Sequence, residues 1–258
     1  MIAAITLIAI HEIYSALGFE KKDWLMYAVL VPYTLLVMLS SYSAMRKLVM
    51  PMSFVLVTFF AIYLVVRNGT ISYQKASGLL VFSGIVIFCF YSFVLLKERL
   101  PVEKFGYDAV FFILLILCFA WGGDTCAYFA GRAFGKHKLC PVVSPKKTVE
   151  GAIGGVLGTM VFGVVATLIY SIAANRMEAF TRSNIGVSGF QVHIALLGCI
   201  AAVLGIYGDL FASVVKRQCG IKDYGTIFPG HGGILDRFDS VMFIAPFVTM
   251  VITAVFYA

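Results

Sequence analysis

Charged residues are scarce in this chain of 258 amino acids. Asp, Glu, Lys and Arg make up 13% of the residues and hydrophobic residues 61%, whereas an average soluble domain has roughly 25% charged residues. So few charges cannot cover a surface that faces water on all sides. The composition therefore excludes a soluble globular protein and predicts an integral membrane protein, with room for about eight helices of roughly 20 residues.

The sequence also lacks any C-x-x-C pair among its six cysteines. Without such a pair it predicts neither a zinc site nor a disulfide framework, and we interpret the cysteines as small buried hydrophobic residues. The net charge of +7 would by itself allow nucleic-acid binding. However, the basic residues lie between apolar segments, where they orient a protein in the membrane and attract anionic lipid headgroups. We therefore expect the membrane bilayer as a partner and no nucleic acid.

Apolar runs separated by charged or glycine- and proline-rich breaks mark the expected membrane spans. The first run is not typical of a cleavable signal peptide, because it lacks a basic start and a small-residue exit. The pattern predicts an all-α fold, a polytopic transmembrane helical bundle of about eight spans. The expected spans are residues 1–19, 24–45, 51–66, 78–96, 108–130, 151–174, 192–215 and 239–258.

Lysine and arginine are divided unequally between the two sides of the membrane that these spans define. Thirteen of the 20 lie in the loops 20–23, 67–77, 131–150 and 216–238, and the other seven lie in the remaining loops. The positive-inside rule predicts that the set with thirteen faces the cytoplasm. Both polar loops described next belong to that set.

Two polar stretches in the C-terminal half, residues 121–151 and 208–239, interrupt the apolar pattern. Asp124 and Asp209 fall within expected spans, where a lone carboxylate costs several kcal/mol unless it is neutralised. A hard cation is the simplest partner, since Mg²⁺ binds one or two carboxylates together with phosphate oxygens. Six of the 13 acidic residues lie in these stretches: Asp124, Glu150, Asp209, Asp223, Asp236 and Asp239.

Helix capping and ion pairing are the alternative for single members of this set. Asp236 and Asp239, three residues apart, would share a face where the last helix begins, and either could cap that helix or pair with Arg132 or Arg237. This alternative explains one Asp more readily than the whole set. Basic residues near the carboxylates suit phosphate oxygens, although membrane orientation accounts for part of them: Lys146, Lys147, Lys216, Arg217, Lys222 and Arg237.

Glycines surround His231 in the second stretch. Gly230, Gly232 and Gly233 indicate positive-φ turns or a close approach of the backbone to a ligand, and their N–H groups would form an anion-binding nest. His231 is a candidate proton carrier or phosphate ligand, although a loop histidine that only satisfies backbone groups fits the spacing equally well. Carboxylates, cations and a glycine-rich loop together favour phosphoryl or nucleotidyl transfer at a lipid phosphate. An ion-coupled transporter would explain the intramembrane carboxylates but not the clustered cations.

The second stretch resembles the signature of the phosphatidate cytidylyltransferases, S-x-x-K-R-x4-K-D-x-G-x3-P-G-H-G-G-x-x-D-R-x-D, from Ser213 to Asp239. The first stretch, W-x-x-D-T-x-A-Y-x-x-G-R-x-x-G-K followed by S-P-K-K-T-x-E-G, is similar to the same family. The resemblance covers residues 110–258 strongly, and the first 100 residues match only as a variable hydrophobic region. We therefore expect N-terminal variable transmembrane helices over residues 1–107 and a catalytic transmembrane region over residues 108–258.

The resemblance implies a reaction of CTP with phosphatidate to give CDP-diacylglycerol and pyrophosphate in phospholipid biosynthesis. It also implies an inner (cytoplasmic) membrane of a prokaryote, with the active site facing the cytoplasm, and it leaves a homodimer open. The runner-up is a CTP-dependent enzyme acting on another lipid phosphate or lipid alcohol, similar to a CDP-archaeol synthase or a polyprenol kinase.

The same resemblance assigns roles to residues of both stretches. It implies Mg²⁺ at Asp209 and Asp236, with K⁺ as a candidate second cation. The catalytic candidates are Asp209, Asp236, Lys222, Asp223, His231 and Asp239. The substrate-binding candidates are Asp124, Arg132, Ser144, Lys146, Lys147, Ser213, Lys216, Arg217, Gly232, Gly233 and Arg237.

The N-terminal end departs from the family pattern. Family members start with a further apolar helix ahead of the segment that resembles residues 10–14, whereas this chain begins just before that segment. We therefore expect a truncated or alternative start; with one more span ahead of it, the N-terminus would lie in the cytoplasm. His11 and Glu12 lie in the middle of the first expected span, where ionisable residues usually face the interior of the bundle; an amphipathic peripheral helix is the alternative.

Overall fold

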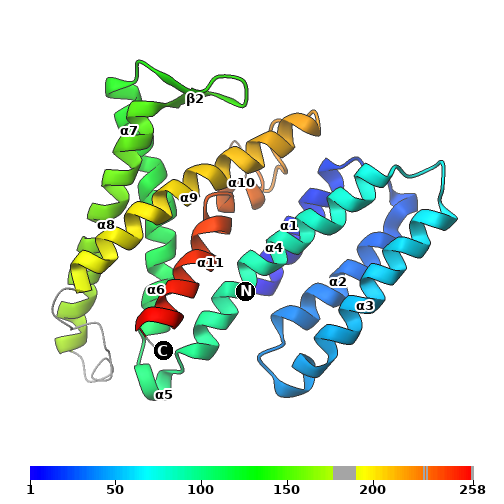
Figure 1. Ribbon diagram of the computed structural model, residues 1–258, viewed down its shortest axis with the longest axis horizontal. Coiled ribbons are helices and arrows are strands. Elements are labelled where there is room, and N and C mark those ends of the chain that lie inside the picture. Colours follow the sequence, from blue (N-terminus) through cyan, green and yellow to red (C-terminus); the bar gives the residue numbers. More distant parts are fainter. Residues whose placement is uncertain (177–189, 229, 231, 257–258) are drawn as a thin grey trace. The chain divides into compact units, whose positions relative to one another are not determined.

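The structure is a computed structural model, and it describes residues 1–176, 190–228, 230 and 232–256 (Figure 1). The described chain is mostly helical, which confirms the predicted all-α class. Its one strand pair, within those residues, is an antiparallel hairpin of β1 (Lys138–Cys140) and β2 (Ser144–Thr148), which the apolar pattern did not predict.

The helices follow the apolar runs of the sequence. In chain order they are α1 (Ile2–Ala16), the 3₁₀ turn η1 (Lys21–Asp23), α2 (Trp24–Met38), α3 (Ser43–Val66), α4 (Tyr73–Arg99), α5 (Val102–Phe105), α6 (Asp108–Leu117), the π-helical turn η2 (Cys118–Gly122), α7 (Gly123–Phe134), α8 (Val149–Arg176), α9 (Phe190–Gln218), α10 (Leu235–Phe238), α11 (Val241–Val251) and the π-helical turn η4 (Ile252–Phe256).

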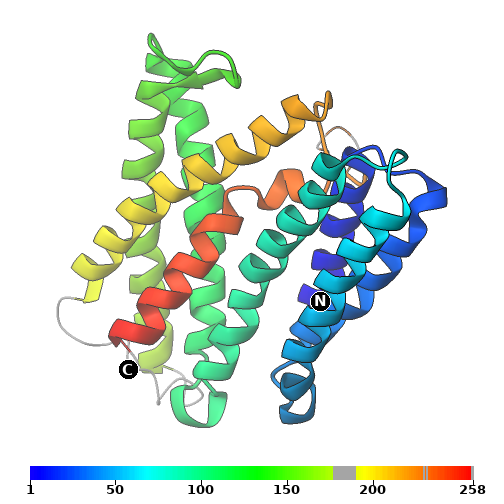
Figure 2. The same ribbon diagram turned by 45° about the vertical axis from the view of Figure 1, so that its right-hand side comes forward.

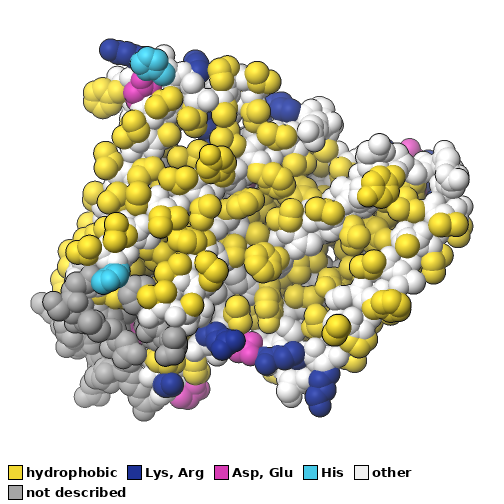
Figure 3. All heavy atoms as spheres, in the orientation of Figure 1, with side chains coloured by type: hydrophobic (Ala, Val, Ile, Leu, Met, Phe, Trp, Pro, Cys, Tyr) yellow, Lys and Arg dark blue, Asp and Glu magenta, His cyan; other side chains and the backbone are white. Residues whose placement is uncertain are grey.

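Five helices of the described chain are long and apolar enough to cross a membrane by length and composition: Ser43–Val66, Tyr73–Arg99, Asp108–Phe134, Val149–Ala173 and Phe190–Gln218. Shorter apolar helices occupy the other three expected spans: Ile2–Ala16, Trp24–Met38 and Val241–Val255. Apolar side chains cover most of the face seen in Figure 3, and the charged side chains visible there lie near its edges. The chain is therefore a polytopic membrane protein, and the count of eight spans stays a prediction.

The boundary between the second and third expected spans is different in the structure. Helix α2 ends at Met38 and α3 begins at Ser43, so residues 43–50 extend the third helix rather than the second span. The polar run after α2 forms a turn, in which the N–H of Tyr42 donates to the carbonyl of Leu39 at 3.1 Å. Pro51 lies inside α3, where its lack of an N–H would usually end a helix; that bias favoured the wrong start.

The described residues form two compact units, and each is described by itself. Unit 1 comprises Met1–Val94 and Val215–Phe238, and unit 2 comprises Leu95–Val214 and Asp239–Ala258. Unit 1 therefore combines the first four helices with a short segment of the C-terminal half. Helix α9 runs through the division between residues 214 and 215.

In unit 1, one side of α1 is buried, and aromatic contacts attach residues 215–238 to helix α4. Ile10 and Ile13 of α1 are fully buried, and α2 packs beside α1 and α3 (Figures 1 and 2). On α4, the ring of Phe82 lies 6.0 Å from that of Tyr224, and the ring of Phe90 lies 5.5 Å from that of Phe238. These contacts hold both the loop after α9 and helix α10 against the N-terminal helices.

Unit 2 is built on close packing of α7 against α8, which run side by side in Figures 1 and 2. A Cβ added to Gly154 would collide with Ala130, and one added to Gly158 would collide with Cys126. These glycines therefore allow the two backbones to approach, as small residues do in membrane helix pairs. The hairpin of β1 and β2 connects the ends of this pair.

Candidate active site

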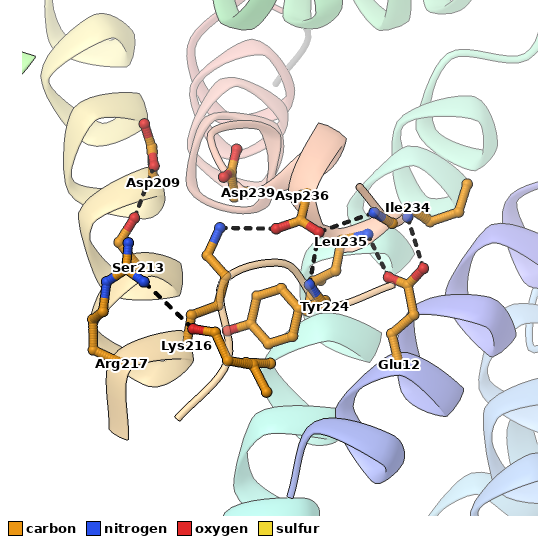
Figure 4. A network of polar contacts seen from close by, with 12 residues as sticks. Glu12, Asp209, Ser213, Lys216, Arg217, Tyr224, Ile234, Leu235, Asp236 and Asp239 are labelled. Carbon is orange, nitrogen blue, oxygen red and sulfur yellow. Dashed lines mark hydrogen bonds and ion pairs between the residues drawn. The ribbon is translucent and has the colours of Figure 1, made fainter. Parts of the chain in front are cut away.

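Asp236 is the most heavily bonded carboxylate of the family signature in unit 1. Lys216 donates through Nζ to its Oδ1 at 2.8 Å, and the backbone N–H groups of Tyr224 and Gly233 donate to its Oδ2 at 2.8 and 2.9 Å (Figure 4). The side chain of Asp236 is 4% exposed and that of Lys216 11%. Asp236 thus joins the end of α9, the following loop and the start of α10 through one buried ion pair and two backbone hydrogen bonds.

The glycine-rich segment has the backbone geometry that its composition indicated. Gly230 and Gly232 have φ values of 76° and 82°, in the left-handed region that favours glycine. The N–H of Phe228 donates to the carbonyl of Gly232 at 3.0 Å and closes the turn. The candidate His231 lies outside the described residues.

The N–H groups next to these glycines bind carboxylates of the protein itself. Those of Tyr224 and Gly233 donate to Asp236. Those of Ile234 and Leu235 donate to Glu12 of α1, each at 2.8 Å. The N–H of Gly233, expected to contribute to a nest for a ligand, therefore already has an anionic partner in this structure.

The remaining candidates of unit 1 lie on its exposed surface. Lys222 and Asp223 are exposed in the loop just before the buried Tyr224. Arg217, also exposed, donates to the carbonyl of Ile221 at 3.5 Å. Arg237 is exposed on α10, next to Asp236 in sequence. These cations are therefore on the surface of unit 1, where a phosphate group can reach them.

Unit 2 holds a second lysine–aspartate pair. Lys147 of β2 reaches α9 and pairs through Nζ with Oδ2 of Asp209 at 2.5 Å. The hydroxyl of Ser213, one helical turn further along α9, donates to Oδ1 at 3.3 Å (Figure 4). The two charged side chains are 25% and 26% exposed. This carboxylate has fewer donors than Asp236 and is more exposed.

Glu150 holds the hairpin that carries Lys147. Its carboxylate accepts hydrogen bonds from the backbone N–H groups of Lys136 and His137 at 3.1 and 3.2 Å, and Nδ1 of His137 lies 2.6 Å away. These contacts tie the start of α8 to the chain just before β1. The other candidates on the hairpin are the half-buried Ser144 and the exposed Lys146.

Asp124 and Asp239 meet at Ser240 in unit 2. The hydroxyl of Ser240 donates to Oδ2 of Asp124 at 3.2 Å, and its N–H donates to Oδ1 of Asp239 at 2.8 Å. Asp124 follows the π-helical turn η2, a backbone irregularity that is frequent at functional sites. A pocket of about 270 Å³ of empty space, open solvent included, is lined by Asp124, Ser240 and several small residues.

Arg132, nearer the end of α7, is exposed and donates to the hydroxyl of Tyr128 at 3.3 Å.

The two predicted metal ligands suit a cation by the chemistry of their partners. Asp209 and Asp236 each face a lysine ammonium, which is itself a cation. A carboxylate offers about four lone-pair sites, so Asp209 has acceptor capacity left, and Asp236 has less. Among the residues that the structure describes, no three or more His, Cys, Asp or Glu side chains are grouped to hold a metal ion. At either carboxylate, phosphate oxygens of a substrate would have to complete the coordination of a metal ion.

Glu12 and the hairpin are the parts that sequence reasoning missed. Glu12 had no assigned role, because a contact from a carboxylate to backbone N–H groups leaves no signal in residue type. For the hairpin, the only signal was the polar stretch itself, in which lysines at positions 138, 146 and 147 flank a short turn.

Comparison with known proteins identifies what these sites resemble. A model of the cytidylyltransferase family matches residues 1–255. Three curated relatives all bear the name phosphatidate cytidylyltransferase. The protein of Bacillus subtilis is 33% identical over 187 residues, 72% of this chain and 61% of the relative. That of Staphylococcus haemolyticus is 40% identical over 148 residues (56% and 50%), and that of Rickettsia bellii 42% over 134 residues (52% and 54%). The chain spans about half the length of the curated relatives it matches.

Proposed function

The chain belongs to the cytidylyltransferase family, and from that membership we propose that it condenses CTP with phosphatidate to give CDP-diacylglycerol and pyrophosphate. The family match over residues 1–255 carries this proposal. The geometry supports it, because the two polar stretches contribute two lysine–aspartate pairs rather than scattered surface charges.

The proposed reaction is an in-line displacement at phosphorus. A phosphate oxygen of phosphatidate attacks the α-phosphorus of CTP, a new P–O bond forms, and the bond to the β-phosphate breaks to release pyrophosphate. Both substrates are anions, so positive charge must offset their repulsion. The exposed cations Arg217, Lys222 and Arg237 suit that task, since Arg binds phosphate through two hydrogen bonds and Lys as a point charge.

Lys147 and Asp209 are the pair that we assign to substrate directly. Lys147 lies on an exposed hairpin and can exchange the carboxylate of Asp209 for a substrate phosphate without leaving a buried charge unpaired. Asp209 would then be released to bind a cation. Mg²⁺, which the family resemblance assigns to Asp209 and to Asp236, with K⁺ as a candidate second cation, would neutralise the charge that builds on the leaving pyrophosphate.

The proposed location is the inner membrane of a bacterium, with the active site facing the cytoplasm. The bacterial relatives and the apolar helices support a bacterial membrane. The excess of Lys and Arg in the loops that carry the signature supports the cytoplasmic side. CTP is a water-soluble nucleotide of that compartment, so this orientation would bring both substrates together.

The test is an assay of the purified protein with labelled CTP, phosphatidate and Mg²⁺. We expect a labelled CDP-lipid, its formation to require Mg²⁺, and release of one pyrophosphate per lipid. Failure to form a CDP-lipid with every phosphatidate tried would refute the proposal. If an isoprenoid ether lipid phosphate reacts and phosphatidate does not, the chemistry stands and the lipid is wrong.

A further inference from the structure

Glu12 is a buried carboxylate whose hydrogen-bond partners lie in the distant glycine-rich segment. Glu12 is 3% exposed in the middle of α1. Its Oε1 accepts the N–H of Ile234 and its Oε2 that of Leu235, each at 2.8 Å, across 222 and 223 residues of sequence (Figure 4). Both oxygens are used in this fork-like contact, and all three residues belong to unit 1.

This contact satisfies groups that would otherwise be costly to bury. The N–H groups of Ile234 and Leu235 lie at the start of α10, where a helix has no internal acceptor for its first donors. An unpaired buried N–H is unfavourable, and an isolated buried carboxylate far more so. Hydrogen bonds from N–H to an ionised acceptor are short and strong. Each side of the contact therefore stabilises the other.

Two glycines, Gly225 and Gly233, lie against the side chain of Glu12. A Cβ added to Gly233 or to Gly225 would collide with the carboxylate of Glu12. Two glycines of the signature are thus explained by the side chain that they enclose.

The same backbone also carries the catalytic candidate Asp236. Three consecutive N–H groups, of residues 233 to 235, donate to two carboxylates: the first to Asp236 and the next two to Glu12. A change in how Glu12 holds this backbone would change where the carboxylate of Asp236 lies and how it meets Lys216.

We propose that Glu12 is a positioning residue for the cytidylyl transfer: it fixes the backbone of residues 233–235 and through it the orientation of Asp236. The inference rests on the proposed function for its catalytic part only. It makes α1, a helix of the variable half, a support of the active site.

The test compares Glu12→Gln with Thr6→Ala, a control on the same helix. Thr6 is fully buried, and its hydroxyl donates within α1 to Ile2. Gln keeps the shape of Glu but presents one acceptor and one donor, so one of the two N–H groups loses its partner. We expect faster amide hydrogen exchange in the peptide that contains residues 233–236 of Glu12→Gln, and no change there in Thr6→Ala.

Kinetics then separate positioning from general stability. We expect kcat of Glu12→Gln to fall by roughly 10-fold to 100-fold, as for supporting residues of metal sites, while KM for CTP changes less than about 3-fold. Gly233→Ala should lower kcat in the wild-type background and cost little more in Glu12→Ala, where the collision is relieved. Combining Gly233→Ala with Glu12→Asp, whose side chain is shorter, should recover part of the activity that Gly233→Ala alone loses.

The outcomes are distinguishable. Unchanged exchange at residues 233–236 in Glu12→Gln would overturn the inference, whatever the activity. Faster exchange with unchanged kcat would also overturn it, because the contact would then serve folding alone. If the wild-type protein makes no CDP-lipid, the proposed function fails, while the exchange experiment still decides whether Glu12 holds this backbone.

Discussion

The two lysine–aspartate pairs have the same chemistry and very different surroundings. Asp236 pairs with Lys216 in unit 1, with side chains 4% and 11% exposed and two further backbone donors. Asp209 pairs with Lys147 in unit 2, with side chains 26% and 25% exposed and one hydroxyl donor. A third pair, Glu20 with Lys22, is 69% and 60% exposed. The exposed fraction of the side chains thus increases from the Asp236 pair through the Asp209 pair to the Glu20 pair.

The difference indicates that Asp236 has a structural role and that Asp209 is available to bind another group. Removing one partner of a buried pair leaves an uncompensated charge away from water, whereas an exposed charge is readily solvated. Asp236 therefore orders the signature loop whatever else it binds. Asp209 can change partners at a lower cost than Asp236, which is what a group that receives a cation or responds to a substrate needs.

The largest effect is expected from Asp236→Asn. The substitution leaves the buried ammonium of Lys216 without its counter-charge, so we expect a loss of about 3–5 kcal/mol in the free energy of unfolding, together with loss of activity. Denaturant titration in detergent micelles measures the first and the CTP assay the second. Wild-type stability with retained turnover would contradict both the framework role and the metal assignment of Asp236.

Asp209→Asn should separate activity from stability. We expect CDP-lipid formation to fall by roughly 100-fold or more, because the carboxylate is proposed to bind the cation. The free energy of unfolding should change by about 1 kcal/mol at most, since both partners reach solvent. Parallel denaturant and Mg²⁺ titrations of the two Asp→Asn variants measure this. Equal destabilisation of both variants would remove the distinction between the pairs.

Lys147→Gln tests whether the cation of the open pair meets substrate. We expect KM for CTP or for phosphatidate to rise about 10-fold, equivalent to about 1.4 kcal/mol of binding, with little change in stability. The matched control is Lys138→Gln, an exposed lysine on the other strand of the same hairpin. A similar rise in KM for both variants would show that only the charge of the hairpin matters.

The smallest effect is expected at the fully open pair. Hydrogen bonding to Lys22 holds the pKa of the Glu20 carboxyl below its ordinary value. The small stabilisation is therefore present above the ordinary Glu pKa and is lost as the pH falls through the lowered one. Glu20→Gln should leave the melting temperature at pH 7 unchanged. A drop as large as that of Asp209→Asn would show that exposure does not rank these pairs.

The sequence predicted which residues belong to the signature, and the structure shows why their partners were harder to predict. Lys216 and Asp236 both fall in one motif, so their proximity was foreseeable. The donors from Tyr224 and Gly233 are backbone groups, which every residue but proline carries, and Glu12 lies more than 200 residues away in sequence. Long-range contacts to backbone are invisible to motif and composition.

The secondary structure, too, was predicted correctly in some parts of the chain and not in others. Apolar runs predicted helices because a backbone in lipid must satisfy its hydrogen bonds internally, which a helix does within one segment. The hairpin was missed because it is short and polar, and the start of α3 was misplaced because the helix continues through Pro51, a residue that usually ends a helix. The division into a variable region, residues 1–107, and a catalytic region, residues 108–258, stays a prediction, as do the individual roles of the site residues.

The glycine seam between α7 and α8 has a mechanical consequence. The hairpin joins these two helices, so the seam sets the span over which the hairpin is strung. A methyl group added at Gly154 would push α8 away from α7. Because β2 leads directly into α8, this shift would also move the strand that carries Lys147. The glycines between α7 and α8 therefore influence, through the hairpin, the position of Lys147 relative to Asp209.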